Sequence, residues 1–478
     1  MSRLSRWALL IGLAAPVAAS ADEPGQPTLR LEDVLESVTA HDPRIRRAVE
    51  RLREAEGNTT AARGAFDPRL EGDVGLLTGA YYDLRRANAE LRQPTTLWGS
   101  EIYVGYRIGL GLNERWPTYR EQQTLSGGEV RAGIEIPIWR GGLIDEDRAQ
   151  RTRALELQEA AGEGLASTVL DLELAAAGAY WNWVSAGEKL EVARSLLELA
   201  EERDAQLRQR LVAGSIAEFD VTDNERILLE RRAFLVASER AFEQAAFELS
   251  LFVRDAAGRS VVPTVERLPE ELVPSDPMEL SEAEVMDRVL ACHPDLGQAR
   301  AELRASEVDV RLTRNQLAPE IDGLFEYSRD LGQLTGTEQD VTLPGNVFKA
   351  GLQLSMPLIF RDERGRASAA RAKVAARSAE VQFLEDTLRA RVRDAASAVR
   401  AADERVELTG DVVDTAAELA EGERRRFDVG SSNLIFVNLR EQQAAMARMR
   451  LIDAIAVAEV ERTRWDTTTR VQCGAASR

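Results

Sequence analysis

The chain has 478 residues, a formal net charge of −19 and 44% hydrophobic residues. So acidic a chain repels phosphates, and we expect no non-specific binding to nucleic acid. Its length allows two to four ordinary domains, so the patterns along the chain must decide the fold class.

The N-terminal segment has the pattern of a secretory signal peptide. Arg3 and Arg6 precede an apolar stretch, and the small residues Ala19-Ser20-Ala21 follow it. We expect residues 1–21 to be removed, which takes away two arginines and leaves a mature charge of −19 − 2 = −21. No later segment has the roughly 18 uninterrupted apolar residues of a spanning helix, so any membrane crossing must use strands.

Cysteine and histidine are too scarce to indicate a chemical site. Cys292 and Cys473 are the only cysteines; one long-range bridge is compatible with the sequence, but we expect unpaired thiols. His41 and His293 are the only histidines, and a capping or surface role is expected for both. No nucleophile, phosphate-loop or metal-binding motif is present, so the sequence predicts no catalytic residue, cofactor or metal.

Two segments 251 residues apart resemble each other. The sequence AHDPRIRRAV at 40–49 matches ACHPDLGQAR at 291–300 in its alanines and its proline, and the same offset pairs Pro68 with Pro319. The sequence therefore predicts two large repeats, 22–270 and 271–470, followed by a tail at 471–478.

Each repeat contains segments in which apolar and polar residues alternate. They lie within about 66–139 and about 319–360, at 70–76, 102–112, 130–138, 321–328 and 348–356. Alternation with period two predicts strands that have one apolar and one polar face, which is typical of a membrane β-barrel. A water-soluble β-sandwich is the alternative.

Heptad patterns predict long helix pairs at about 142–254 and about 362–466. In the first, apolar residues recur in 4-3 steps from Leu165 to Ala200, with many alanines; in the second they recur from Leu388 to Ala420. A helix over 143–213 would be roughly 100 Å long at 1.5 Å per residue. A soluble coiled coil fits this periodicity equally well, but it leaves the alternating segments unexplained.

The order of these features, in duplicate, resembles the TolC family of outer-membrane efflux proteins. The resemblance rests on FDPRLEGDVGL with LAPEIDGLFEY, GIEIPIWRGG with GLQLSMPLIF, and the turns LVAGSIAEFDV and FDVGSSNLIFV. It covers nearly the whole mature chain. It implies an α+β membrane protein in which three subunits complete a transmembrane β-barrel, continuous with a long periplasmic α-helical coiled-coil barrel.

The first strand region departs from the family's pattern of two strands per repeat. The segment 102–112 lies between the two ordinary strands, and chain topology requires an even number of crossings. Either 81–93 is a further strand that ends in a turn at Gln93-Pro94-Thr95, or 80–126 is a large extracellular loop that contains a hairpin. We favour the loop, because Arg85, Arg86, Glu90 and Arg92 would put much charge on one crossing.

The turns between the paired helices are expected to form the periplasmic tip. Gly214-Ser215 and Gly430-Ser431 match at an offset of 216, and a glycine at such a position allows the left-handed backbone that ends a helix. These four residues are candidates for contact with an adaptor. The run EGERRRF at 421–427 is interpreted as a solvated helix face near this tip.

The resemblance also implies candidates for a pore constriction. Asp220 and Asp223 follow the first turn at i and i+3 and share a helix face, but the second repeat has Phe436 and Leu439 at the matching positions. The candidates are therefore Asp220, Asp223 and Phe436. A structural role of both aspartates in the first turn of the following helix is the alternative.

The sequence thus predicts a passive outer-membrane exit duct of a tripartite efflux or type I secretion system. Its expected partners are two further copies of the chain, a periplasmic adaptor (membrane fusion) protein, an inner-membrane transporter and outer-membrane lipid, with a long extension into the periplasm. A periplasmic coiled-coil adaptor or structural protein with a soluble β domain is the alternative. The sequence does not distinguish drug efflux, metal export and protein secretion.

Overall fold

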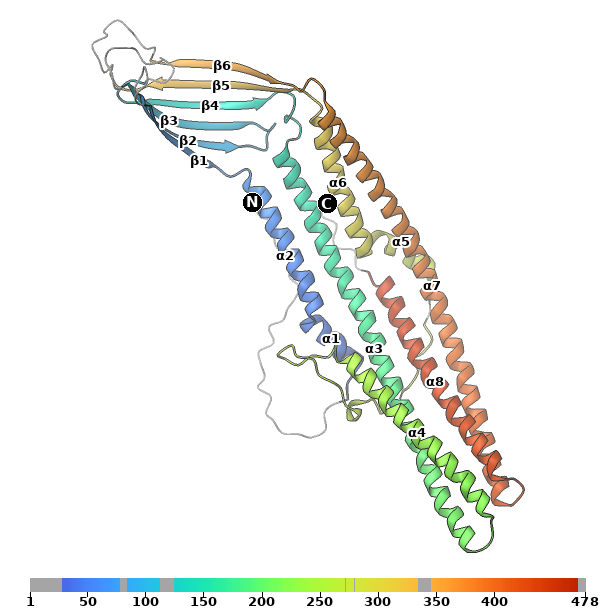
Figure 1. Cartoon of the computed structure of the whole chain (residues 1–478). Helices are drawn as coiled ribbons and strands as arrows, with labels where there is room; N and C mark the ends of the chain where they lie inside the picture. Colours follow the sequence, from blue (N-terminus) through green and yellow to red (C-terminus); the bar gives the residue numbers. More distant parts are fainter. Residues whose placement is uncertain are drawn as a thin grey trace.

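The computed structural model describes residues 28–77, 84–111, 124–270, 272–278, 280–333 and 345–471. The expected signal peptide 1–21 and Cys473 lie outside these ranges. A single sheet lies at one end of the molecule, and long helices lead from it to two hairpin turns at the other end (Figure 1).

The sheet has six strands in the order of the chain. They are β1 (Arg69–Leu77), β2 (Leu84–Pro94), β3 (Glu101–Gly111), β4 (Glu129–Pro137), β5 (Glu320–Asp330) and β6 (Val347–Ser355). Every neighbouring pair is antiparallel. Within the described residues, β1 and β6 are edge strands with one strand neighbour each.

The interpretation of 80–126 as a large extracellular loop is wrong. β2 pairs with β1 over its whole length and β3 pairs with both β2 and β4, so the first repeat contributes four strands to the sheet. Charge does not prevent the crossing, because Arg86, Glu90 and Arg92 alternate onto one face of β2. The turn lies at 95–100, close to the position that the alternative prediction gave it.

Eight α-helices and one 3₁₀ helix complete the described elements. They are α1 (Leu31–His41), α2 (Pro43–Gly64), α3 (Glu146–Val212), α4 (Glu218–Leu249), η1 (Val265–Arg267), α5 (Glu282–Cys292), α6 (Pro294–Asn315), α7 (Arg361–Asp428) and α8 (Leu434–Thr469). The 67 residues of α3 give a rod of roughly 100 Å. In the described part of the chain, no helix combines the length and the apolar character needed to cross a membrane.

The elements recur at two offsets. α1 and α2 are followed 251 residues later by α5 and α6 with identical lengths, whereas the turn glycines Gly214 and Gly430 are 216 residues apart. The difference, 251 − 216 = 35 residues, corresponds to a segment that the first half contains between β1 and β4 and that includes the β2–β3 hairpin. The hairpin is therefore an insertion relative to the second half.

The heptad seams are the buried faces of the long helices. Trp183 of α3 is fully buried in a cluster with α1 and α4, and Val392 and Ala395 of α7 are buried in a second cluster near α5 and α8. Ala176 and Ala395 are almost completely inaccessible to solvent. Small residues at these positions let neighbouring helices approach closely.

Enlarging either alanine is expected to destabilise the helical rod. The changes Ala176→Leu and Ala395→Leu should each cost about 1–3 kcal/mol, because a well-packed site must shift to admit extra methyl groups. Chemical unfolding of the detergent-purified protein measures the loss, and Ala401→Leu at an exposed position of α7 is the control. Variants as stable as the parent would exclude tight packing along these seams.

The expectation of an unpaired thiol is wrong for Cys292. This residue ends α5 and takes part in a disulfide bond. It packs against the same apolar cluster as Val471, which precedes Cys473 by two residues in the sequence. Packing therefore brings the end of the described chain to the helix that carries Cys292, a proximity that spacing in the sequence does not reveal.

Candidate functional site: the charged face of the sheet and the helical tip

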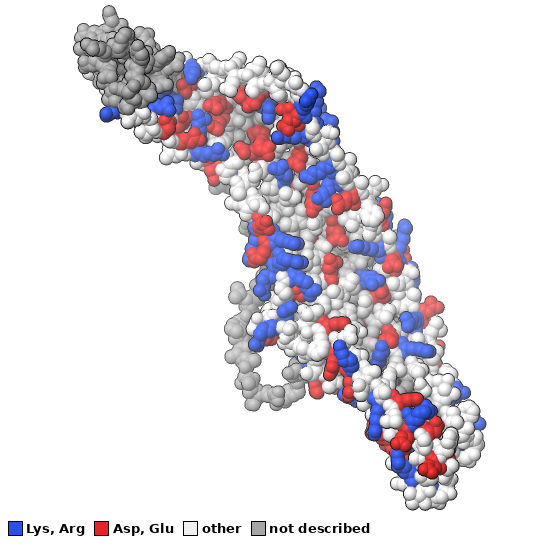
Figure 2. Space-filling model, viewed as in Figure 1, with Lys and Arg blue, Asp and Glu red and all other residues white. Residues whose placement is uncertain are grey.

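The two faces of the sheet differ sharply in chemistry. The strand registers place side chains of both signs on one side, which we call the charged face: Glu71, Asp73, Arg86, Glu90, Arg92, Glu101, Arg107, Glu129, Arg131, Glu135, Glu326 and Lys349. Figure 2 shows acidic and basic side chains gathered on the sheet at its end of the molecule. Such a face suits contact with water.

The opposite side, which we call the apolar face, is exposed along the whole sheet. Its members include Leu70, Val74, Leu76, Leu91, Ile102, Val104, Tyr106, Val130, Phe325, Tyr327, Phe348, Leu352 and Leu354. Val74 on β1 is 87% exposed and Phe348 on β6 is 81% exposed. An apolar surface of this extent is not stable in water and marks contact with protein or membrane.

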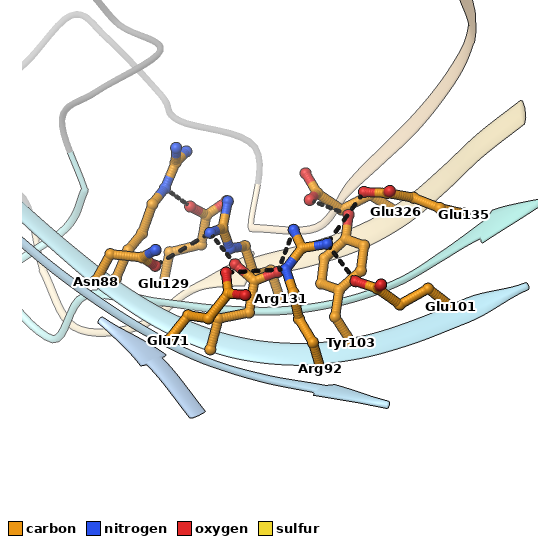
Figure 3. Close-up of polar contacts among 11 residues, drawn as sticks. Glu71, Asn88, Arg92, Glu101, Tyr103, Glu129, Arg131, Glu135 and Glu326 are labelled. Atoms are coloured by element: carbon orange, nitrogen blue, oxygen red, sulfur yellow. Dashed lines mark hydrogen bonds and ion pairs between the residues drawn. The ribbon is translucent and has the colours of Figure 1, made fainter. Parts of the chain in front are cut away.

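Arg92 is the centre of the network on the charged face (Figure 3). Its guanidinium lies 2.5 Å from Glu101 on β3 and 2.9 Å from Glu90 on its own strand. The same group lies over the ring of Tyr103, 5.0 Å from its centroid. The Tyr103 hydroxyl donates to Glu326 on β5 at 2.6 Å, so the network spans strands from both halves of the chain.

Arg131 on β4 extends this network. It donates to Glu90 at 2.6 Å and to Asn88 at 3.1 Å, both on β2. Arg107 on β3 pairs with Glu129 on β4. These contacts bind neighbouring strands to one another and hold the long side chains along the sheet.

A glycine makes room for Tyr103, whose side chain is only 3% exposed. A Cβ atom added at Gly133 would lie 2.4 Å from the Tyr103 ring, whereas one added at Gly351 of β6 meets no atom within 4 Å. Position 133 therefore allows the ring to lie flat across β4, where its hydroxyl reaches Glu326.

Replacing Gly133 is expected to displace this ring. The change Gly133→Ala should cost about 1–3 kcal/mol, because the new methyl group overlaps Tyr103. The thermal unfolding of the detergent-purified protein, followed by the loss of sheet signal, measures the effect. The control Gly351→Ala lies on the same face in open space and should leave the stability unchanged, so equal effects of both changes would contradict this role of Gly133.

At the other end of the molecule, the two helical turns have the same backbone. Gly214 and Gly430 have φ of 73° and 76°, in the left-handed region. The N–H of Ser215 donates to the carbonyl of Arg210, and that of Ser431 donates to Arg426, which closes each helix with a Schellman motif. Both turns lie at the same end of the molecule (Figure 1).

The predicted constriction residues lie directly after these turns. Asp220 is exposed, and its carboxylate accepts a hydrogen bond from the N–H of Ala217 at 3.2 Å, which supports the start of α4. Asp223 pairs with Arg226 at 3.2 Å. Phe436, at the matching position of α8, has a side chain that is 53% exposed.

A buried charge cluster behind the tip was missed by the sequence analysis. Glu441 of α8 is 5% exposed and contacts an arginine from each of the other three long helices. The distances are 2.5 Å to Arg203 of α3, 3.5 Å to Arg231 of α4 and 3.2 Å to Arg424 of α7. Arg231 also donates to the carbonyl of Leu196 at 2.8 Å.

The residues of this buried cluster shift one another's pKa values. Burial alone would raise the pKa of Glu441, but hydrogen bonds and charge from the arginines outweigh it and hold that pKa below its ordinary value. Burial lowers the pKa of Arg231, although Glu441 opposes the shift. Glu441 therefore stays ionised and joins the two helical hairpins at this level.

The interpretation of EGERRRF as a solvated face holds for Glu421 and for Arg424 to Arg426, which are exposed, but not for Glu423. Arg424 reaches Glu441, and Glu423 is buried, where it accepts a hydrogen bond from Ser432 beyond the turn. The sequence signal for this buried cluster was the presence of charged residues between the heptad positions of the long helices.

Among the described residues, no group of three or more histidine, cysteine, aspartate or glutamate side chains is arranged to hold a metal ion.

Comparison with known proteins shows what this chain is similar to. Residues 285–458 match the profile of the family described as outer membrane efflux protein. The second half of the chain is therefore similar to the outer membrane efflux protein family. The TolC resemblance seen in the sequence is confirmed by this match and by the structures described next.

Proteins similar to this chain include outer-membrane proteins. Outer membrane protein OprJ of Pseudomonas aeruginosa is 23% identical over 306 residues, which cover 61% of this chain and 61% of OprJ, less than two thirds of its length. CusC, whose structure is described in terms of transmembrane channel formation, has a TM-score of 0.66 at 13% identity and covers 95% of both chains.

The outer membrane protein VceC of Vibrio cholerae has the same fold. Its TM-score is 0.64 at 15% identity, and the alignment covers 93% of this chain and 97% of VceC. The matched family is described as outer membrane efflux protein, CusC in terms of a transmembrane channel and VceC as an outer membrane protein. None of these descriptions is that of an enzyme. The chain thus shares the fold of these structures, which in this chain is mostly helical with one sheet.

Proposed function

We propose that three copies of this chain form a passive exit duct across the outer membrane. The observation that carries this proposal is the sheet with one apolar and one charged face, attached directly to helical rods of roughly 100 Å. The apolar face would contact lipid and the charged face would line water, as in membrane β-barrels. The rods would extend into the periplasm.

The edges of the sheet support closure by further copies. β1 and β6 each have nine residues, and their unpaired backbone groups could not remain unsatisfied in lipid. Pairing β6 of one copy with β1 of the next keeps the apolar face continuous. Three copies then contribute 3 × 6 = 18 strands, and barrels of 16–18 strands leave an aqueous channel.

The helical end would meet the rest of an export system. The turns at Gly214-Ser215 and Gly430-Ser431 are exposed and alike, which suits repeated contact with a periplasmic adaptor protein. An inner-membrane transporter would deliver the cargo, in efflux or in type I secretion. The duct itself would be passive, because it only conducts the cargo that the transporter delivers.

Cell fractionation and conductance test this proposal. The mature chain should sediment with outer membranes, require detergent for release, behave as a trimer and conduct ions in planar bilayers. A periplasmic adaptor with a soluble β domain is disfavoured by the exposed apolar face, and it would appear in the soluble periplasmic fraction without detergent. Release of the chain by osmotic shock alone would overturn the duct.

A further inference from the structure

We propose that Arg85 and Arg329 bind the phosphate groups of anionic lipid in the outer leaflet of the outer membrane. This inference rests on the membrane position of the sheet proposed above. It concerns the binding partner of two particular side chains. The heptad helices and the helical turns do not depend on this lipid contact.

These two arginines are the only charged residues on the apolar face of the six strands, within their described bounds. Arg85 lies opposite Leu76 of β1, and Arg329 lies opposite Val130 of β4. Both side chains are exposed, and neither forms an ion pair within the described part of the chain. In a protein with a net charge of −19, the two exceptions to an otherwise uncharged surface are both positive.

Both arginines lie near the end of the sheet that is remote from the helices, which we call the far rim. Two tyrosines of the apolar face lie beside them: Tyr106 donates to the carbonyl of Gly127 at 2.9 Å, and Tyr327 donates to Asn346 at 3.0 Å. Tyrosine with a satisfied hydroxyl is typical of the membrane interface. The far rim therefore has the composition of a headgroup layer.

The opposite end of the sheet has a second aromatic belt. Trp98 and Trp139 are exposed there, and the Trp98 indole donates to the carbonyl of Pro137 at 2.8 Å. From Val130 to Trp139 the chain advances nine residues, about 30 Å at 3.4 Å per residue. A strand tilt of about 40° reduces this to about 23 Å, close to the apolar height of about 25 Å in such barrels.

Charge and geometry then select the lipid chemistry. At this height the arginine stems lie along apolar neighbours while their guanidinium groups reach the headgroups. A guanidinium forms paired hydrogen bonds with phosphate oxygens, so a glycolipid with exposed phosphates should bind better than a zwitterionic headgroup. β2 and β5 are interior strands of the sheet, so pairing of copies along β1 and β6 leaves both arginines uncovered.

The test measures lipid binding to the delipidated, detergent-purified protein. Diphosphoryl lipid A, monophosphoryl lipid A and phosphatidylcholine are titrated separately and their binding is followed by native mass spectrometry. The double variant Arg85→Gln/Arg329→Gln is compared with Arg86→Gln. Arg86 is the next residue in the sequence, but it lies on the charged face, 3.4 Å from Asp73, and serves as the matched control.

We expect diphosphoryl lipid A to bind most tightly and the double variant to bind it about 30-fold more weakly, from the attraction of two basic groups to an anionic surface. Arg86→Gln should bind as the parent does. Equal binding of diphosphoryl lipid A by the parent and the double variant would overturn the proposal. So would competition by free pyrophosphate, because the site would then take soluble phosphate instead of lipid.

Reconstitution separates this proposal from the duct itself. Parent and double variant should both insert into phosphatidylcholine vesicles and conduct ions, since the rest of the apolar face is unchanged. If both insert but lipid A binding does not depend on Arg85 and Arg329, the headgroup proposal fails and the duct stands. If the parent does not enter vesicles of any composition, the membrane position itself is wrong.

Discussion

Replacing Glu441 by glutamine should loosen the helical tip by about 3–5 kcal/mol. Removal of one partner from a buried ion pair leaves uncompensated charge, which is the costly event. Here the change Glu441→Gln leaves the buried Arg231 and the mostly buried side chain of Arg203 without this carboxylate. Glutamine has nearly the same shape, so packing is preserved and the effect is electrostatic.

Hydrogen exchange at the tip measures this loss. Amides of 200–212 and 434–446 should exchange at least 100-fold faster, since each 1.4 kcal/mol is a factor of ten in local opening. The matched control is Glu421→Gln on α7, where the carboxylate pairs with Arg425 in solvent and should matter little. Equal exchange in both variants would exclude a role for the buried cluster.

The same cluster should make the tip sensitive to acid. The folded-state pKa of Glu441 is lowered, so its stabilisation is fully present above the unfolded-state value of about 4.5. It is lost as the pH falls below that value towards the lower folded-state pKa. Exchange at the tip should therefore accelerate in acid in the parent, and Glu441→Gln should lose this contribution.

Local patterns in the sequence predict the elements of this fold well. Heptads give the position of α3 and α7, and period-two alternation gives five of the six strands. The sixth strand, β2, was not predicted, because its charged residues were counted together without asking which face of the strand each one occupies. Arg86, Glu90 and Arg92 are separated by even numbers of residues and share one face, and among the charged residues of β2 only Arg85 faces away from them. The change of offset from 251 to 216 was also present in the sequence and locates the inserted hairpin.

Contacts between distant residues explain what the sequence could not predict. Arg203 and Glu441 are 238 residues apart, and Tyr103 and Glu326 are 223 residues apart. No periodicity connects such pairs, because each charge alone is compatible with a solvated helix or strand. A pore constriction is harder still to predict from the sequence, because it would be formed by side chains from several copies of the chain.

Asparagine at both Asp220 and Asp223 should remove most of the cation preference of the duct. Three copies would place six carboxylates around the narrow end, where a confined mouth focuses their field on passing ions. In the single chain, Asp220 is exposed and accepts one hydrogen bond from Ala217, which leaves carboxylate oxygen free to face a pore. Asp223 shares Arg226 with Glu230, which lies 2.6 Å from that arginine.

Planar bilayers separate this role from a purely structural one. The double variant Asp220→Asn/Asp223→Asn should fold, because a favourable charge in the first helical turn contributes only about 0.3–1 kcal/mol. The control Asp411→Asn/Asp414→Asn removes the same charge from exposed i and i+3 positions of α7 and should leave the reversal potential unchanged. Unchanged selectivity in an assembled Asp220/Asp223 variant would return both residues to helix capping. The narrowest point would then be assigned to Phe436, whose ring would restrict the pore by size without selecting charge.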